Sequence, residues 1–252
     1  MSRISNMFFW VPNTITALNL VCGSIAVFLA IDGRLGWAAV FILTAAVFDF
    51  LDGFSARLLK AYSTIGKELD SLADTVSFGL APAAIVFTML EFTLFGENLS
   101  IYDIALGASW NQRIVLLTSL VIPVAGAFRL AKFNTDDRQS DQFLGMPIPA
   151  NAIFFASLAL ILEWGNNEAI SAIILNKYVL LTAIFICSFL MVSELPMFSM
   201  KFKNLKLKEN AIRFLFLGAT LLMIIFLQIF ALPLIIIWYV LLSVITYFAA
   251  MK

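Results

Sequence analysis

Uncharged, largely apolar runs alternate with short polar segments along the chain. A bilayer core of about 30 Å needs roughly 20 apolar residues per helix, and several runs reach that length with their flanking residues. The pattern therefore predicts an all-α membrane protein. The runs cover residues 14–31, 35–48, 75–90, 114–128, 143–162, 178–193 and 214–251.

The last run is long enough for two helices. Pro233 lies midway along it and has no N–H to continue a helix, so we expect a helical hairpin that turns there. The prediction is then about eight transmembrane helices. Phe8, Phe9 and Trp10 precede the first run, and aromatic residues at that depth favour an interfacial helix over residues 1–11, with a disordered tail as the alternative.

Composition agrees with a membrane location and removes several kinds of chemistry. The chain is 62% hydrophobic and 13% charged, whereas a soluble domain carries about a quarter charged residues. It contains no histidine, which excludes the commonest zinc ligand and every Ser-His triad. The net charge is zero, and no basic domain indicates a nucleic-acid partner.

The basic residues predict how the chain sits in the membrane. With eight spans, 13 of the 16 Lys and Arg residues fall on the side of both termini, and only Arg34, Arg113 and Lys177 fall on the other. Cytoplasmic connections carry an excess of Lys and Arg. Both termini and the region 49–74 are therefore expected at the cytoplasmic face.

Four aspartates lie in that region, although a carboxylate is costly inside a membrane helix. Asp49 and Asp52 are three residues apart at the end of the second predicted span, and Asp70 and Asp74 are four apart at the start of the third. Each pair shares one helical face. The short connection predicts antiparallel neighbouring helices, which would bring all four carboxylates together.

Such a cluster needs cations. Two carboxylates about 6 Å apart repel by roughly 3 kcal/mol at an effective dielectric constant of 20. Oxygen-only ligation suits hard divalent ions such as Mg²⁺ or Mn²⁺, and four carboxylates neutralise two of them. Paired hard metals are used to clamp phosphoryl groups, so the cluster predicts phosphoryl-transfer chemistry.

The residues around the aspartates suit a phosphate ligand. Gly53, Ala56 and Gly66 leave room for close approach, Arg57 offers a fork to phosphate oxygens, and Ser63 adds a hydroxyl group. Each also has a simpler explanation: helix packing for the small residues, an ion pair for Arg57 and a helix cap for Ser63.

Residues 49–74 resemble the signature of the CDP-alcohol phosphatidyltransferases, which fixes eight positions at set spacing: Asp49, Asp52, Gly53, Ala56, Arg57, Gly66, Asp70 and Asp74. The resemblance implies that the aspartates bind the metals, with Asp74 also acting as the base. Gly53, Ala56, Arg57 and Gly66, with Ser63 and Asn13, would then bind CDP-diacylglycerol.

The resemblance also divides the chain. The family core has six membrane helices, so residues 1–193 would form the enzyme domain. A basic cytoplasmic connection over 194–213 and a transmembrane hairpin over 214–252 would follow it. A homodimer is a further expectation from the family.

Two looser motifs, residues 128–134 and 145–150, are similar to the phosphatidylserine synthases within this family. Serine is a zwitterion, so its pocket needs a cation for the carboxylate and an acceptor for the ammonium group. Arg129 or Lys132 could supply the cation, and Asn134, Asp136 or Asp137 the acceptor. All five could equally be solvated residues of a cytoplasmic connection.

The expected reaction is transfer of the phosphatidyl group from CDP-diacylglycerol, a membrane lipid, to the hydroxyl group of L-serine with release of CMP. Glycerol 3-phosphate, inositol or an inositol phosphate is the alternative acceptor. A cation-coupled transporter is a more distant alternative, because its intramembrane carboxylates would form a path across the membrane.

Overall fold

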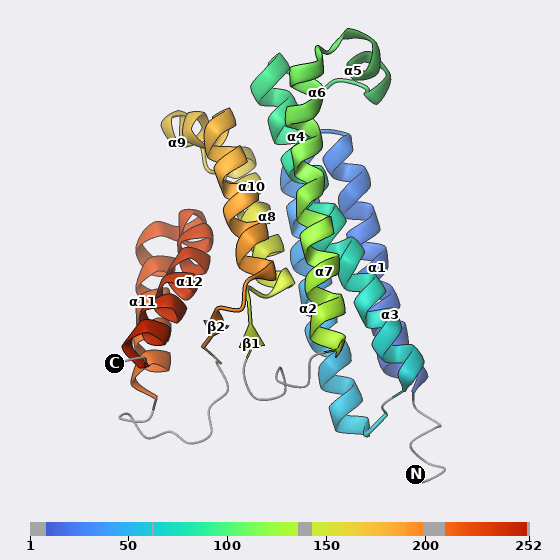
Figure 1. The fold of residues 1–252 in the computed structure, drawn as a ribbon, viewed down its shortest axis with the longest axis vertical. Helices are drawn as coiled ribbons and strands as arrows, with labels where there is room; N and C mark the ends of the chain where they lie inside the picture. Colours follow the sequence, from blue (N-terminus) through green and yellow to red (C-terminus); the bar gives the residue numbers. More distant parts are fainter. Residues whose placement is uncertain (1–8, 62, 136–142, 199–209, 251–252) are drawn as a thin grey trace.

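The computed structural model describes residues 9–61, 63–135, 143–198 and 210–250, and helices dominate these segments (Figure 1). The helices are α1 (Trp10–Ile31), α2 (Leu35–Leu59), α3 (Thr64–Asp74), the π-helix η1 (Thr75–Leu80), α4 (Ala81–Phe95), α5 (Ile101–Gly107), α6 (Trp110–Leu117), the 3₁₀ turn η2 (Thr118–Leu120), α7 (Val121–Thr135), α8 (Ile148–Trp164), α9 (Glu168–Ile174), α10 (Lys177–Val192), α11 (Ala211–Leu227), the 3₁₀ turn η4 (Gln228–Phe230) and α12 (Ala231–Ala250). Two short strands, β1 (Phe143–Leu144) and β2 (Pro196–Met197), pair antiparallel.

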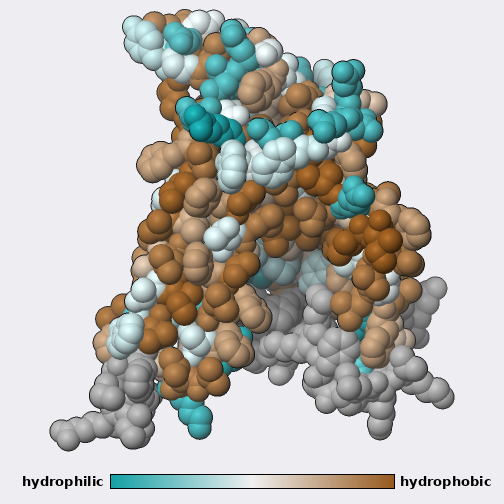
Figure 2. All heavy atoms as spheres, turned by 180° about the vertical axis from the view of Figure 1, so that it is seen from behind, coloured by the Kyte–Doolittle hydropathy of each residue, from teal (hydrophilic) through white to brown (hydrophobic). Residues whose placement is uncertain are grey.

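The protein is an integral membrane protein. Five stretches of the described helix are long and apolar enough to cross a bilayer, and α9 with α10 makes a sixth if this pair, bent by 58°, is one span. Figure 2 shows hydrophobic residues over the middle of one face and hydrophilic residues gathered toward its upper end. The predicted all-α membrane fold is confirmed.

Helix α1 organises the first part of the fold. Both α2 and α3 pack against α1 more extensively than against each other. The expectation that α2 and α3 would pack directly on each other is therefore wrong: each packs on α1, and they approach each other through their aspartate side chains. The polar side of α1 consequently faces the two helices that carry the aspartates.

The turn between α2 and α3 is set by its caps. Lys60 ends α2 in the left-handed conformation with φ of 50°, and Ala61 N–H donates to the carbonyl oxygen of Ala56 at 3.0 Å. Ser63 then begins α3, where its hydroxyl oxygen accepts a hydrogen bond from Gly66 N–H at 2.9 Å. The simpler explanation for Ser63, a helix cap, is thus confirmed.

The third membrane helix changes character along its length. Helix α3 is polar enough to carry Asp70 and Asp74, and it continues through η1 into the apolar α4. The π-turn holds an i→i+5 hydrogen-bonding pattern, which adds a residue relative to the α-helix.

The C-terminal hairpin forms, but its turn is displaced from the predicted position. Helices α11 and α12 lie side by side (Figure 1), and the chain reverses at η4, where Gln228 has a φ of 49°. Pro233 instead lies in the first turn of α12, where no intrahelical partner for an N–H group is required.

Two predicted features fall largely outside the described residues. The interfacial lead-in over 1–11 overlaps the structure only from Phe9, and α1 already begins at Trp10. Most of the basic connection over 194–213 also lies outside them.

Candidate active site

Carboxylate oxygens of three of the four aspartates lie close together. Asp49 of α2 and Asp70 and Asp74 of α3 each offer one carboxylate oxygen, and these oxygens all lie within 4.8 Å of one another. The convergence predicted from the helical spacing is therefore found for these three residues.

The cluster fits a divalent metal. Mg²⁺ binds oxygen at about 2.0–2.1 Å and Ca²⁺ at about 2.3–2.6 Å, so opposite ligands of one ion lie roughly 4–5 Å apart. The three oxygens all lie within 4.8 Å of one another, close enough to share one ion. Hard carboxylate donors without sulfur or imidazole favour a hard cation, so the cluster could bind such a metal.

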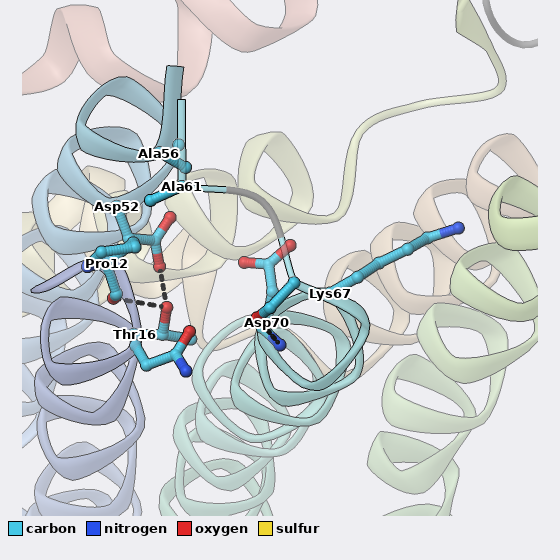
Figure 3. Close-up of a pocket in the computed structure, with 11 residues that line it drawn as sticks. Pro12, Thr16, Asp52, Ala56, Ala61, Lys67 and Asp70 are labelled. Carbon is cyan, nitrogen blue, oxygen red and sulfur yellow. Dashed lines mark hydrogen bonds between the residues drawn. The ribbon is translucent and has the colours of Figure 1, made fainter. Parts of the chain in front are cut away.

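The fourth aspartate is held separately. Asp52 is buried, and its Oδ2 accepts a hydrogen bond of 2.6 Å from the hydroxyl group of Thr16 on α1. Thr16 also contacts the carbonyl oxygen of Pro12 at 3.0 Å, as the dashed lines in Figure 3 show. Figure 3 also shows the carboxylate of Asp70 across from Asp52. The two aspartates therefore face the same cavity.

This cavity has a volume of about 210 Å³ and is formed by α1, α2, the turn after α2 and the start of α3. It contains most of the residues that the sequence assigns to the nucleotide-lipid donor. The lining residues are Pro12, Asn13, Thr16, Asp52, Gly53, Ala56, Ala61, Ser63, Gly66, Lys67 and Asp70.

Two glycines keep the cavity open in different ways. A Cβ atom on Gly66 would lie 2.8 Å from Oδ1 of Asn13 and 2.9 Å from the Ser63 hydroxyl oxygen, so no side chain fits there without displacement. A Cβ atom on Gly53 would meet only Nη2 of Arg57, at 3.9 Å. Arg57 is therefore close to the cavity edge, although it does not line the cavity.

Asp74 has a polar partner on α1. Its Oδ1 accepts a hydrogen bond of 3.4 Å from Nδ2 of Asn19, whose side chain is fully buried. Ser77 of η1 contacts the backbone of α1 at the same residue: its hydroxyl group donates a hydrogen bond of 3.0 Å to the Asn19 carbonyl oxygen. This arrangement orients the Asp74 carboxylate from α1.

Arg129 extends the cluster toward α7. The side chain is 8% exposed, and its guanidinium group interacts electrostatically with Asp74. Its Nε has no hydrogen-bond partner among the described residues, and the group lies 5.8 Å from the ring of Phe133. A buried guanidinium N–H without a partner is costly and suits an anionic ligand.

The other predicted acceptor residues have protein partners or lie outside the described residues. Lys132 makes an ion pair of 2.7 Å with Glu194, and Asn134 donates a hydrogen bond of 3.0 Å to the hydroxyl group of Ser71, next to Asp70. Asp136 and Asp137 lie outside the described residues.

Sequence reasoning missed Thr16 and did not recognise Asn19 as a partner of Asp74. A signal was present: Asn13, Thr16, Asn19 and Gly23 recur every three or four residues and so share one face of an otherwise apolar helix. Polar positions that line up on a membrane helix indicate a functional face. Lys67, at the start of α3, was also missed as a lining residue.

Comparison with known proteins agrees with this geometry. The family model for CDP-alcohol phosphatidyltransferase matches residues 9–189. A CDP-diacylglycerol–serine O-phosphatidyltransferase from Bacillus subtilis (strain 168) is 34% identical over 165 residues, which are 65% of this chain and 81% of the relative.

Further relatives are covered over a smaller part of their length. A CDP-diacylglycerol–serine O-phosphatidyltransferase from Mycobacterium leprae (strain TN) is 35% identical over 74% of this chain and 57% of its own length. An archaetidylserine synthase from Methanothermobacter thermautotrophicus is 31% identical over 61% of this chain and 59% of its own. The matched segment contains the aspartate cluster, the donor cavity and Arg129, and the chain therefore belongs to the CDP-alcohol phosphatidyltransferase family.

Proposed function

We propose that this protein is a phosphatidylserine synthase, which transfers the phosphatidyl group of CDP-diacylglycerol to the hydroxyl group of L-serine and releases CMP. The observation that carries the proposal is the buried Arg129 guanidinium beside Asp74, which offers an anion-binding group next to the aspartate cluster. Relatives named for the same reaction support it.

The aspartates are the proposed metal ligands. Asp49, Asp70 and Asp74 would hold one ion, and Asp52 would join Asp49 and Asp70 in holding a second, either Mg²⁺ or Mn²⁺. Bound metal would supply charge neutralisation for the diphosphate and for the departing CMP. The Thr16 hydroxyl group would keep the Asp52 carboxylate in its binding orientation.

The cavity beside the cluster is the proposed site of the cytidine diphosphate group. Its lining includes Asn13, Ser63 and Gly66 together with Gly53 and Ala56. Arg57 would donate hydrogen bonds to phosphate oxygens from the cavity edge. The acyl chains would stay in the bilayer, since the cavity lies at the end of membrane helices α1 and α2.

Asp74 is the proposed general base. Asn19 orients its carboxylate, and the serine hydroxyl proton would pass to the carboxylate as the oxygen attacks the phosphorus atom. A carboxylate is a weak base for an alcohol, so its contribution depends on correct positioning against the hydroxyl group.

Arg129 is the proposed ligand of the serine carboxylate. Lys132 was an equal candidate from the sequence, but its ammonium group is already paired with Glu194. Arg129 is buried near Asp74 and retains an unpartnered Nε. Asn134, held beside Asp70 through Ser71, would help to close the acceptor pocket.

Eight membrane passes follow if three further assignments hold. The stretch Ala211–Phe248 divides into α11 and α12, the bent pair α9 and α10 counts as one pass, and α8, with 17 residues, is about 26 Å long and counts as another. The basic residues would then place both termini and the active site at the cytoplasmic face. An interfacial helix at residues 1–11 and a homodimer stay predictions.

The test is CMP release by the purified protein in detergent with CDP-diacylglycerol and Mg²⁺ or Mn²⁺. Serine, glycerol 3-phosphate, inositol and inositol phosphate are supplied in separate reactions. Release with serine alone is the expected result. Release with a different alcohol would replace the acceptor, and absence of release with every alcohol would overturn the transferase activity itself.

A further inference from the structure

The C-terminal hairpin lies outside the segment that the family model matches, which ends at residue 189. Nothing in the family comparison therefore gives α11 and α12 a role. One face of α12 nevertheless reaches the acceptor side of the candidate site, and its contacts are specific.

The contacts run through a short segment, residues 194–198, here named the strap. Its strand β2 pairs with β1, and Gly145 N–H donates to the carbonyl oxygen of Leu195 at 2.9 Å. At its first residue, Glu194 binds Lys132 of α7. The strap thus connects the acceptor end of α7 to the segment that begins α8.

Helix α12 holds the last residue of the strap by both backbone groups. Phe198 N–H donates to the hydroxyl oxygen of Ser243 at 3.3 Å, and the Tyr239 hydroxyl group donates to the Phe198 carbonyl oxygen at 3.4 Å. The Phe198 ring lies 5.0 Å from the ring of Tyr239 and 5.5 Å from that of Phe216. Tyr239 and Ser243 are four residues apart and so share a face of α12.

The strap is linked to Arg129 through α7. Glu194 pairs with Lys132, which lies three residues after Arg129 and therefore on the same face of that helix. Arg129 is nine-tenths buried, and its Nε is unpartnered among the described residues. The orientation of its guanidinium group therefore depends on how this face of α7 is held.

We propose that Tyr239 is a positioning residue for the acceptor: it fixes the strap, and the strap holds the face of α7 from which Arg129 binds the substrate carboxylate. The inference rests on the proposed function. The residues that line the donor cavity belong to α1, α2, α3 and the turn between α2 and α3. The C-terminal hairpin would thus influence the acceptor and leave the nucleotide-lipid donor unaffected.

The test is Tyr239→Phe, which keeps the ring packing and removes the hydroxyl group. The expected result is a rise of about fivefold in the KM for serine, the value of one hydrogen bond, with an unchanged KM for CDP-diacylglycerol. Tyr247→Phe, the same substitution two turns along α12, is the matched control and should change neither constant. In an Arg129→Lys background, Tyr239→Phe should add little, because both changes affect one interaction.

An unchanged KM for serine in Tyr239→Phe would overturn the inference. A parallel change in both Michaelis constants, or a fall in kcat alone, would mark Tyr239 as a packing residue and overturn it as well. The acceptor specificity of the wild-type protein distinguishes failure of this inference from failure of the proposed function. If it releases CMP with another alcohol only, serine is the wrong acceptor, and the KM of that alcohol then decides the role of Tyr239.

Discussion

The hydroxyl group of Thr16 donates a hydrogen bond of 2.6 Å to Oδ2 of Asp52, across 36 positions of the chain. The contact joins the first membrane helix to the second at the wall of the proposed donor cavity. It makes α1 part of the candidate active site, although α1 carries none of the aspartates.

Removal of this hydrogen bond should weaken metal binding. Thr16→Val preserves the shape of the side chain and deprives Asp52 of its donor, so the activity should require about tenfold to a hundredfold more Mn²⁺, as for other groups that orient metal ligands. A titration of CMP release with Mn²⁺ measures this. Thr16→Ser retains the hydroxyl group and should behave like the wild type; equal loss in both variants would point to packing instead.

Asp74 and Asp49 should differ when each is replaced by Asn. Asp74→Asn should reduce turnover by at least about 10²-fold, the contribution of a general base, while CDP-diacylglycerol still binds. Asp49→Asn should weaken both turnover and binding, because Asp49 is the proposed ligand of both ions, whereas Asp74 is the ligand of one. Equilibrium binding of CDP-diacylglycerol, measured alongside CMP release, distinguishes the two. Normal turnover in Asp74→Asn would remove this residue as the base.

Substitutions of Arg129 and Lys132 should differ in their effect on the KM for serine. Arg129→Lys keeps the positive charge and loses the planar fork, so the KM for serine should rise about tenfold or more, with a smaller change for CDP-diacylglycerol. Lys132→Ala breaks the ion pair with Glu194 that joins the strap to α7, and its effect on the KM for serine should be smaller, about fivefold or less. Michaelis constants for both substrates are the measurement. The reverse order would assign the carboxylate to Lys132.

Gly23 should be intolerant of even a methyl group. A Cβ atom there would lie 2.5 Å from the backbone Cα of Ser77, so α1 would have to move away from η1. Gly23→Ala should therefore lower the Tm of the protein in detergent, with a cost of about 1–3 kcal/mol or more. Gly218→Ala, on α11, has open space around its Cβ position and is the matched control. Equal Tm values for the two variants would show that the α1–η1 contact relaxes freely.

Much of the aspartate cluster was predictable because it depends on local periodicity. The i, i+3 and i, i+4 spacing and a short turn were enough to bring Asp49, Asp70 and Asp74 together. The position of Asp52 was not fully predictable, since its partner Thr16 lies on a helix that the spacing argument did not place. The length of a loop limits how far apart two helices can be, but it does not decide whether they pack on each other or on a third helix.

The acceptor side was less predictable because its contacts are long-range and irregular. Two-residue strands such as β1 and β2 carry no periodic signal, and the ion pair between Lys132 and Glu194 joins residues 62 positions apart. The sequence could therefore name Arg129 and Lys132 together but could not separate them. Likewise, the hairpin was predicted from length and from Pro233, whereas its turn depends on the backbone of Gln228.

The π-turn η1 divides the third membrane helix into two angular phases. Successive residues of an α-helix are rotated by about 100°, so one extra residue in a π-turn turns everything before it by that amount relative to everything after it. The directions of the Asp70 and Asp74 side chains therefore cannot be extrapolated from the helical positions of α4. The relative orientation of the two halves is kept only while the number of residues from Asp74 to Ala81 stays the same. A single deletion there would rotate the carboxylates away from Asp49 while every side chain in the chain stayed chemically intact.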